Sequence, residues 1–468
     1  MRWTVVLAWA LAAAWGAFAA IARPPVPVVV LALVLVGAAL WRASRGRTAP
    51  RVVVAALAVL AMARPHRDDL GAGRIYRDQT YHHQVLRALN DVATDGADVA
   101  EVLAATADVR AGDAEGWYAA WTALGDRNLA RARATRDRLS AGHALLRAHG
   151  YYARAEFFLA PEDPRRPPSF ARGTRVFYEG LDTLGVAYEK LTVPYGRDHL
   201  NALYYPPPPP ARAPLIVFCG GYDSTLEELY FFLVAAARAR GYGVLAYEGP
   251  GQGSALRDQG LRLLPEWERP TSAVLDGYLA SHPRPDKIVL VGLSLGGYLA
   301  PRAAAFDARI DGVVSYDVFF DVGAAARRAV PAIAYTLRRI GLERVVDAVA
   351  TIRGRLDPAV GWGLANGRWT LGKARTLDVV DALSAFTLEG VAGRIRQDVL
   401  ILAGEDDQFV PLEQVEQYRR ALVNARSVTT KVYDRASGGA EHSQLGAPTL
   451  WQADFFDWME EKFGEAAR

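Results

Sequence analysis

The stretch Gly292-Leu293-Ser294-Leu295-Gly296-Gly297 follows the apolar run 288–291 and opens a segment, 298–306, that favours a helix. A Gly-x-Ser-x-Gly pattern between a buried strand and a helix is typical of a sharp turn that exposes the serine hydroxyl. Glycine suits both ends of such a turn because a side chain would collide with the adjoining backbone. The stretch predicts that Ser294 is a nucleophile and that the backbone N–H of Leu295 binds an oxyanion. A purely structural glycine-rich turn is the alternative.

Apolar strands alternate with helical segments on both sides of this turn. The expected strands are 214–221, 242–249, 287–294, 310–318, 397–405 and 427–434. Continuous apolar strands separated by helices indicate a mostly parallel sheet covered by helices on both faces. Two earlier strands, 187–196 and 199–207, are expected to form an antiparallel start. The predicted fold class is therefore α/β, with functional side chains at the carboxyl ends of the strands.

A serine nucleophile needs a general base, and His442 is the candidate. In proteins with this strand–turn–helix arrangement the catalytic residues follow the order Ser, then Asp or Glu, then His. Of the eight histidines only His442 follows Ser294, and it lies in a loop between the last expected strand and the last expected helix. We therefore expect His442 to accept the proton of Ser294.

The acid that orients this histidine is expected at the end of the strand 397–405. Three acidic residues follow one another there, and Asp407 has the spacing Gly-x-x-Asp-x-x-Val-Pro that suits the role. Its carboxylate would hold the tautomer of His442 and stabilise the imidazolium. Asp406 is the second candidate, and Asp317, at the end of the strand 310–318, is the third.

The second oxyanion donor is expected in the loop after the strand 214–221. The backbone N–H of Gly221 or of Tyr222 is the candidate. Cys219, the single cysteine of the chain, precedes this loop. We expect Cys219 to be a small buried residue and not a second nucleophile.

Neither a cofactor nor a metal is predicted. The glycine-rich segment 249–253 departs from the dinucleotide-binding pattern because Ser254 occupies the position of its last glycine. The adjacent pair His82-His83 cannot place two metal ligands on one helix face. A single cysteine also excludes a disulfide framework within the chain and a thiolate-rich metal site.

The chain is predicted to contain a helical domain, 65–186, and a catalytic domain, 187–468, with a lid-like insertion at about 318–396. Apolar residues in the helical domain recur at three- and four-residue spacing, and Asp113 is placed to cap a helix. This domain is rich in aromatic residues, of which Trp117 and Tyr152 are predicted to contact the substrate. The alternative is that these aromatic residues form the core of the helices.

The segment 1–64 is predicted to anchor the protein in a membrane. Apolar runs without charge occupy 3–22, 26–41 and 52–63. The first two are expected to be transmembrane helices, and the third is short for a span. Four arginines within 42–51 would place the catalytic domain in the cytoplasm. Three spans, a cleaved signal peptide and a start at Met62 are the alternatives.

The charge distribution argues against a nucleic-acid partner. The chain has 468 residues, of which 51% are hydrophobic and 22% charged, as in globular proteins. Its net charge of +3 is unevenly distributed along the chain. Residues 1–67 hold eight arginines and no acidic residue, so residues 68–468 carry a net charge of −5. The expected partner is a small molecule, apolar or aromatic. The oligomeric state is left open.

Seven segments together resemble one branch of the α/β-hydrolase superfamily. This branch includes 2,6-dihydropseudooxynicotine hydrolase and the fungal yellowish-green polyketide-shortening hydrolases. The segments are FCGGYDSTLEE (218–228), YEGPGQG (247–253), GLSLGG (292–297), GEDDQFVP (404–411), GGAEHSQLG (438–446), DVAEVL (98–103) and GDAEGWYAAW (112–121). The resemblance covers roughly 75–460. The branch usually has cysteine after the catalytic histidine, whereas this chain has Ser443.

The resemblance implies an α/β-hydrolase fold in which the helical domain caps the active site. It also implies hydrolysis of an ester, or of a carbon–carbon bond next to a ketone, through Ser294, His442 and Asp407 and an acyl-enzyme. Two other classes stay open. One is a peptidase related to the prolyl oligopeptidases, although no propeller repeat is visible, and the other is a catalytically idle scaffold anchored in the membrane.

Overall fold

The computed structural model describes residues 74–209 and 211–464, which fall into two compact units. The described part of one unit is 327–361, and the other unit comprises 74–326 and 362–464. Within the described residues no helix is both long enough and apolar enough to cross a bilayer. The predicted membrane segment, 1–64, lies outside the described residues.

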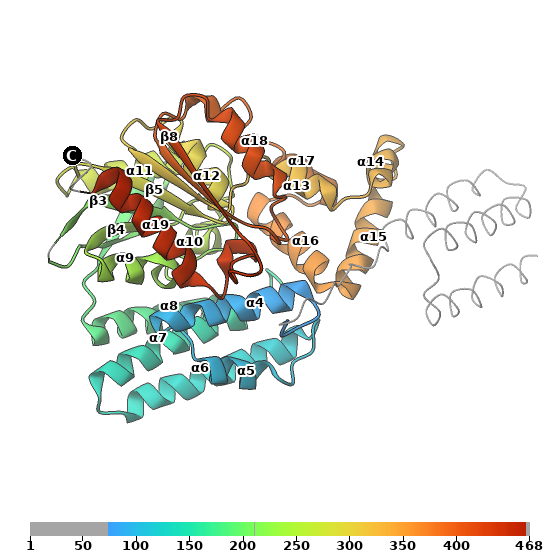
Figure 1. Ribbon diagram of the computed structural model, residues 1–468. Helices are drawn as coiled ribbons and strands as arrows, with labels where there is room; N and C mark the ends of the chain where they lie inside the picture. Colours follow the sequence, from blue (N-terminus) through green and yellow to red (C-terminus); the bar gives the residue numbers. More distant parts are fainter. Residues whose placement is uncertain (1–73, 210, 465–468) are drawn as a thin grey trace, which may run out of the picture. The chain divides into compact units, whose positions relative to one another are not determined.

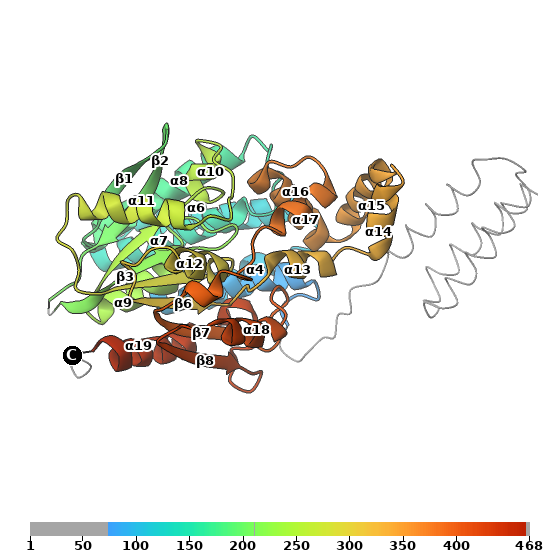
Figure 2. The same ribbon diagram turned by 90° about the horizontal axis from the view of Figure 1, so that it is seen from above.

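An eight-stranded sheet forms the centre of the larger unit, and Figure 2 shows it from β1 and β2 at one edge to β8 at the other. Its strands are β1 (Glu189–Tyr195), β2 (Asp198–Tyr205), β3 (Arg212–Cys219), β4 (Tyr242–Tyr247), β5 (Ile288–Leu293), β6 (Gly312–Tyr316), β7 (Asp398–Gly404) and β8 (Ser427–Tyr433). The order is β1-β2-β4-β3-β5-β6-β7-β8. Strand β2 pairs antiparallel with both β1 and β4, and β3 to β8 are parallel. The predicted α/β fold class is confirmed.

Helices cover both faces of this sheet (Figure 1). The longer helices of the larger unit are α4 (Gln79–Asn90), α5 (Val99–Thr106), α6 (Ala114–Ala134), α7 (Arg138–Ala155), α8 (Arg166–Leu184), α11 (Glu268–Leu279), α12 (Gly296–Ala304), α17 (Thr376–Leu383), α18 (Glu413–Ala421) and α19 (Pro448–Phe463), and α16 (Pro358–Leu371) crosses into it from the smaller unit. Side chains of β3 alternate between two hydrophobic clusters. Val217 packs with α11 and α12, whereas Phe218 packs with α19 and α8. Burial on both faces explains why these strands read as continuous apolar runs.

The helical domain is built from α4 to α8 and shares a core with the sheet. Phe177 and Leu181 of α8 belong to the same hydrophobic cluster as Phe218. Figure 1 shows α4 and α8 on the side of the domain that faces the sheet, with α5 and α6 farther away. Asp113 caps α6 by accepting a hydrogen bond from the backbone N–H of Gly116 at 2.8 Å, as predicted. The helical domain and the sheet therefore belong to one compact unit.

The predicted insertion 318–396 folds into helices. Its segment 327–361 forms the described part of the smaller unit, in which α14 (Ala332–Arg339) and α15 (Glu343–Leu356) pack on each other. The part of the insertion that belongs to the larger unit includes α17 and most of α16.

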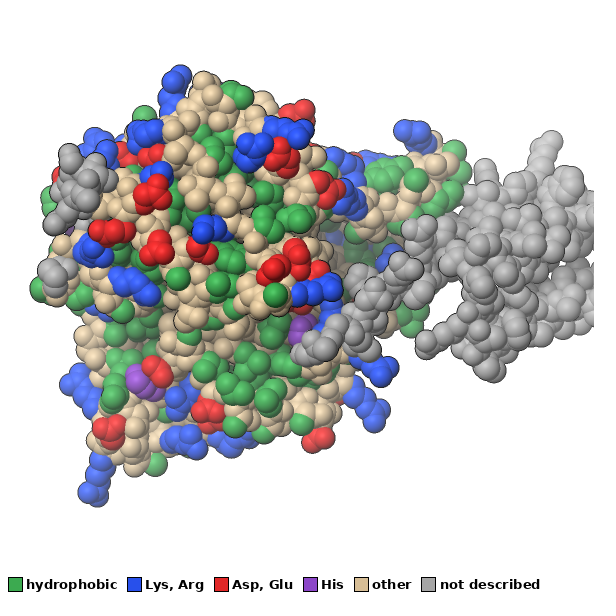
Figure 3. All heavy atoms as spheres, in the orientation of Figure 1, with side chains coloured by type: hydrophobic (Ala, Val, Ile, Leu, Met, Phe, Trp, Pro, Cys, Tyr) green, Lys and Arg blue, Asp and Glu red, His purple; other side chains and the backbone are tan. Residues whose placement is uncertain are grey.

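Acidic and basic side chains are interspersed on the face of the molecule drawn in Figure 3. A nucleic-acid-binding surface would instead gather basic side chains on one face or along one helix.

Candidate active site

Ser294 stands on a strained turn between β5 and α12. Its φ of +58° is a left-handed conformation that residues other than glycine rarely adopt. The backbone N–H of Ser294 donates to the carbonyl of Tyr316 at 2.7 Å, and the N–H of Gly297 donates to the carbonyl of Ser294 at 2.7 Å. These two bonds tie the turn to β6 and to the start of α12, so the serine side chain is held at the carboxyl end of the sheet.

The glycines around Ser294 are required by close backbone contacts. A Cβ at Gly292 would lie 2.0 Å from the carbonyl oxygen of Gly296. A Cβ at Gly297 would lie 1.8 Å from the carbonyl oxygen of Asp317. Both contacts are far shorter than packed atoms permit. The sequence pattern therefore reflects a turn in which β5, α12 and the end of β6 meet without room for side chains.

His442 lies against Ser294, as the order of residues in the chain predicts. The Oγ of Ser294 and the Nε2 of His442 are 2.7 Å apart. The imidazole is buried, with 3% of the side chain exposed, and the ring of Phe409 meets it edge-on at 4.9 Å. Backbone φ values of +57° at Ser443 and +44° at Gln444 bend the loop immediately after the histidine. This bend presents the ring to the serine.

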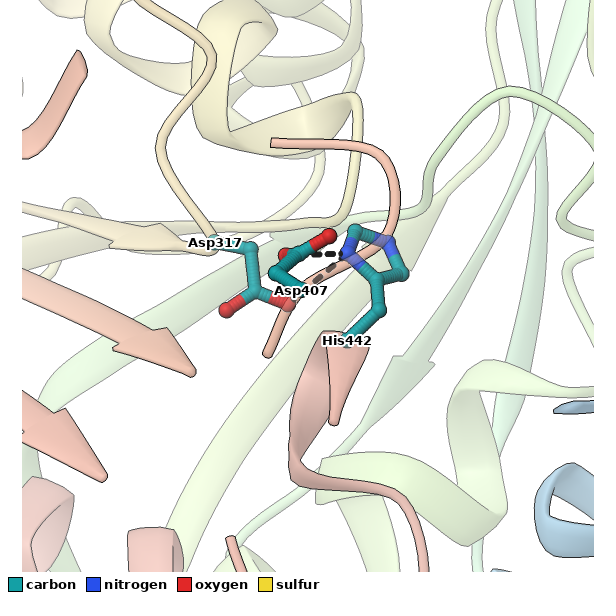
Figure 4. A group of neighbouring side chains, drawn as sticks. All are labelled: Asp317, Asp407 and His442. Carbon is teal, nitrogen blue, oxygen red and sulfur yellow. Dashed lines mark hydrogen bonds and ion pairs between the residues drawn. The ribbon is translucent and has the colours of Figure 1, made fainter. Parts of the chain in front are cut away.

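Asp407 contacts the other nitrogen of the imidazole, as Figure 4 shows. Its Oδ2 lies 2.6 Å from Nδ1 of His442. Its Oδ1 accepts the backbone N–H groups of Phe409 at 2.8 Å and of Val410 at 2.9 Å. By contrast Asp406, the second candidate, pairs with the exposed Arg435. The geometry thus places Asp407, and not Asp406, in line with His442 and the serine.

Asp317 is a second carboxylate beside the same imidazole. Its Oδ2 lies 3.2 Å from Nδ1 of His442 and also accepts the backbone N–H of Ser443. Its Oδ1 accepts a hydrogen bond from the Nε2 of Gln444 at 3.1 Å. Asp317 is completely buried and has a φ of +52°. The third candidate acid therefore lies within reach of the histidine, but its hydrogen bonds go to the backbone and side chain of the histidine loop.

The two carboxylates dominate the protonation of His442. Burial by itself lowers the pKa of the imidazole, but the charges of Asp407 and Asp317 outweigh that effect and raise the pKa to about 9. Burial also raises the pKa of Asp317 to about 6, although the charge of His442 opposes that shift. The site is therefore arranged to stabilise an imidazolium, which is the charged form that a general base reaches after it takes a proton.

The loop after β3 brings two candidate oxyanion donors to the serine. A Cβ at Gly221 would lie 2.8 Å from the Cβ of Ser294, so the loop backbone passes directly over the serine. The N–H of Gly221, however, donates to the Oγ of Ser224 at 2.8 Å. The backbone N–H groups of Tyr222 and Leu295 form no hydrogen bond within the described part of the chain. Of the two predicted alternatives, Tyr222 is therefore the residue whose backbone N–H is free. Together with the backbone N–H of Leu295 it gives two free donors beside Ser294.

Comparison with known proteins shows the family of this chain. A profile of the alpha/beta hydrolase family matches residues 216–448. The hydrolase acrC of Aspergillus aculeatus is 33% identical over 428 residues, which cover 83% of this chain and 98% of that protein. The chain belongs to the alpha/beta hydrolase family. The 20-hydroxy-prefusarin hydrolase of Gibberella moniliformis is 30% identical to this hydrolase over 416 residues, with 83% of this chain and 98% of that protein covered.

Solved structures share the fold of this hydrolase. The crystal structure of 2,6-dihydroxy-pseudo-oxynicotine hydrolase superposes with a TM-score of 0.62 at 21% sequence identity. The superposition covers 81% of this chain and 96% of that protein. The resemblance stated from the sequence motifs is thus confirmed at the level of family and fold.

Helix α4 adds a row of polar contacts to the site that the sequence analysis missed. Gln79, His83 and Arg87 follow one another at four-residue spacing, which places them on one face of the helix. Gln79 donates to Glu441 at 3.1 Å, and Nδ1 of His83 lies 3.0 Å from Nε2 of Gln408. The ring of His83 also lies 5.9 Å from that of His442. The four-residue spacing of polar side chains was visible in the sequence, but nothing in the sequence indicated what they contact.

Trp117 and Tyr152 lie in the core of the helical domain. Trp117 is fully buried, its Nε1 donates to the carbonyl of Arg154 at 2.8 Å, and its ring packs against Tyr81 and Trp121. Tyr152 is buried among α6, α7 and α8, and its hydroxyl donates to Asp126. Neither residue lines a described cavity. Interhelical packing thus uses both side chains, which favours the alternative that they form the core of the helices.

A cavity of about 60 Å³ lies beside the oxyanion loop and takes its aromatic walls from other residues. These are Phe157, Phe170, Tyr222, Trp362 and Trp369. The rings of Phe157 and Trp362 stack with centroids 4.9 Å apart. Asn366 also lines the cavity, and its buried Nδ2 forms no hydrogen bond with any described residue. The cavity thus combines these aromatic rings and an unsatisfied amide donor with charged side chains, namely Arg87, Arg154, Arg166, Arg257, Glu156, Asp223 and Glu228.

Potential metal ligands and a cysteine thiol also lie near the site. Asp317, Asp407 and His442 are the described side chains whose potential metal-binding atoms lie within 4.8 Å of one another. Their atoms form hydrogen bonds with the serine, with each other and with the loops that carry Asp407 and His442. Burial raises the pKa of the Cys219 thiol to about 12, so the nucleophilic thiolate is disfavoured.

Proposed function

We propose that this protein is a serine hydrolase in which Ser294, His442 and Asp407 form the catalytic triad. The observation that carries the proposal is the continuous line of contacts through the imidazole. Ser294 Oγ lies 2.7 Å from Nε2 and Asp407 lies 2.6 Å from Nδ1. This order of nucleophile, base and orienting acid is the arrangement that activates a serine hydroxyl. The strained backbone of Ser294 supports the same reading.

In the proposed reaction the Oγ of Ser294 attacks a carbonyl carbon while its proton passes to Nε2 of His442. The resulting oxyanion accepts hydrogen bonds from the backbone N–H groups of Leu295 and Tyr222. The imidazolium, stabilised by Asp407, then protonates the leaving group, and an acyl-enzyme forms. A water molecule gives a proton to His442, and its oxygen attacks the acyl carbon, which releases the acid and restores the serine hydroxyl.

The proposed bond is an ester or a carbon–carbon bond next to a ketone. In the first case the leaving group departs as an alkoxide, and in the second as an enolate, and the same imidazolium can protonate either. The aromatic rings that line the cavity beside Tyr222 support an aromatic substrate group, and the arginines of the same cavity and Asn366 are donors for oxygen atoms on that group. The similarity to a 20-hydroxy-prefusarin hydrolase is consistent with a small organic substrate.

Labelling with a fluorophosphonate tests the proposal, because this reagent traps an activated serine. The wild-type protein should be labelled, Ser294→Ala should not be labelled, and His442→Ala should react much more slowly. Ser437→Ala is a matched control, since Ser437 is an exposed serine near the histidine loop and should leave labelling unchanged. Equal labelling and equal esterase activity in wild type and Ser294→Ala would refute the proposal.

We also propose, from the sequence, that the segment 1–64 anchors the hydrolase in a membrane with its catalytic domain in the cytoplasm. The uncharged run 3–22 and the arginines of 42–51 support this proposal. The full chain should remain in the membrane pellet after carbonate extraction, whereas a chain that starts at Asp68 should be released. Full-length protein in the carbonate supernatant would contradict the proposal.

A further inference from the structure

We infer that Arg87 of the helical domain is a positioning residue for the oxyanion hole. The inference rests on the proposed function, because it requires the backbone N–H of Tyr222 to bind an oxyanion. Arg87 lies on α4, 135 residues before Tyr222 in the chain, and touches the loop through the neighbour of that tyrosine. The helical domain would then contribute to transition-state binding as well as cover the site.

The guanidinium of Arg87 joins two carboxylates on the segment that follows β3. Its Nη1 donates to Oδ2 of Asp223 at 2.6 Å, and its Nε donates to Oε1 of Glu228 at 2.5 Å. A third bond runs from Nη2 to the other oxygen of Glu228. The planar fork of arginine fixes direction as well as distance, so the two ends of the segment are held in one geometry.

Most hydrogen bonds of the loop lie on either side of Tyr222. Ser224 accepts the N–H of Gly221, and Gln252 donates to the carbonyls of Gly220 and Gly221 at 2.9 and 2.7 Å. These bonds fix the first half of the loop. On the far side of Tyr222, three contacts hold the second half: the pair between Asp223 and Arg87, the bond between the Tyr222 hydroxyl and Thr370 at 2.9 Å, and the backbone N–H of Gly253, which donates to the carbonyl of Ser224 at 3.2 Å. Of these, the pair with Arg87 is the one that the helical domain supplies to the neighbour of Tyr222.

The rest of the charge network supplies a comparison within the same molecule. Glu228 also pairs with Arg154 at 3.2 Å, and Arg154 pairs with Asp91 at 3.0 Å. Asp91, Arg154 and Glu228 are all nearly fully buried. Asp91 belongs to the network through Arg154, whereas Asp223 is part of the oxyanion loop. If the network were only structural, replacing Asp91 or Asp223 would change stability and not kcat. If it positions the loop, replacing Asp223 would lower kcat and replacing Asp91 would not.

Asp223→Asn is the decisive variant. The Asp223 side chain is one-quarter exposed, so its replacement leaves no buried charge alone, and Arg87 keeps Glu228 as a partner. We expect kcat to fall about 10- to 100-fold at the optimal pH of each variant, with KM changed less than about twofold. Loss of an oxyanion donor itself costs about 10²- to 10³-fold, so weakened positioning should cost less. Affinity for a boronic acid, which mimics the tetrahedral intermediate, should fall in parallel with kcat.

Asp91→Asn is the matched control, and Arg87→Lys is the second test. Asp91→Asn should lower the melting temperature and leave kcat unchanged. Arg87→Lys keeps one charge but cannot reach both carboxylates in the same way, so it should lower kcat and, combined with Asp223→Asn, produce no further loss. Unchanged kcat in folded Asp223→Asn, or an equal loss in Asp91→Asn, would overturn the inference. Activity that survives Ser294→Ala would instead refute the proposed function, which keeps the two failures distinct.

Discussion

Asp317 lies 3.2 Å from Nδ1 of His442, the same nitrogen that Asp407 contacts at 2.6 Å. The two acids come from the ends of neighbouring parallel strands, β6 and β7, so the sheet order brings them together. Asp407 uses its other oxygen to accept N–H groups of its own loop, whereas Asp317 accepts the N–H of Ser443. We therefore propose that Asp407 orients the imidazole and that Asp317 holds the histidine loop.

This division predicts unequal effects of neutralising the two acids. Asp407→Asn should reduce kcat by about 10³- to 10⁴-fold, because an amide stabilises the wrong tautomer of His442 and cannot balance its charge. Asp317→Asn should reduce kcat much less, since the amide oxygen can still accept from Ser443. Steady-state kinetics of both variants, with folding checked by circular dichroism, provide the measurement. A nearly active Asp407→Asn beside an inactive Asp317→Asn would reverse the assignment.

The pH profile of kcat/KM should report the same pair of carboxylates. The pKa of His442 is raised to about 9, and a protonated imidazole cannot accept the serine proton. Activity should therefore rise with pH, with a midpoint above the ordinary histidine value of about 6.5. In Asp317→Asn one of the two negative charges is gone, so the midpoint should move to lower pH. A wild-type midpoint at or below 6.5, or no movement in Asp317→Asn, would contradict this account.

Gly221→Ala should impair catalysis without unfolding the protein. The new Cβ would lie 2.8 Å from the Cβ of Ser294 and 3.1 Å from its Oγ, so the oxyanion loop or the serine must move. We expect kcat to fall by at least about tenfold, since small displacements of a reacting group are costly. Gly363→Ala is the control, because a Cβ there meets no atom within 4 Å. Equal activity in both variants would show that the loop is not close to the serine in solution.

Trp117→Ala should act on stability and not on substrate choice. Removing this buried ring from the helical core should cost about 3–5 kcal/mol of unfolding free energy. The folded fraction should hydrolyse a small acetate ester and a bulky aromatic ester with an unchanged ratio of kcat/KM. Chemical denaturation and the two activity assays measure both quantities. A selective loss of kcat/KM on the bulky ester would show that Trp117 contacts the substrate.

Much of the site was predictable because its signals are local or follow from chain order. Ser294 is identified by glycines whose absent side chains make room for the turn. His442 is identified by its position as the one histidine after Ser294. The choice of Asp407 over Asp406 depended on spacing, and the structure brings Asp407 to the imidazole while Asp406 pairs with Arg435.

Other features could not be read from the sequence because they depend on how distant segments pack. Aromatic residues at helical spacing suit a helix core and a pocket wall equally well, and only the packing of α4, α5, α6 and α7 places Trp117 inside the domain. The contact between Arg87 and Asp223 joins residues 136 positions apart. The choice of Tyr222 over Gly221 depended on a single hydrogen bond to Ser224.

The central claim, that Ser294 forms an acyl-enzyme, is tested most directly by quenching turnover of an activated ester and mapping the acylated peptide by mass spectrometry. The account predicts one added acyl group on the peptide that contains Ser294, and none in Ser294→Ala. An acyl group on Cys219, or full turnover in Ser294→Ala with no acylated peptide, would contradict it.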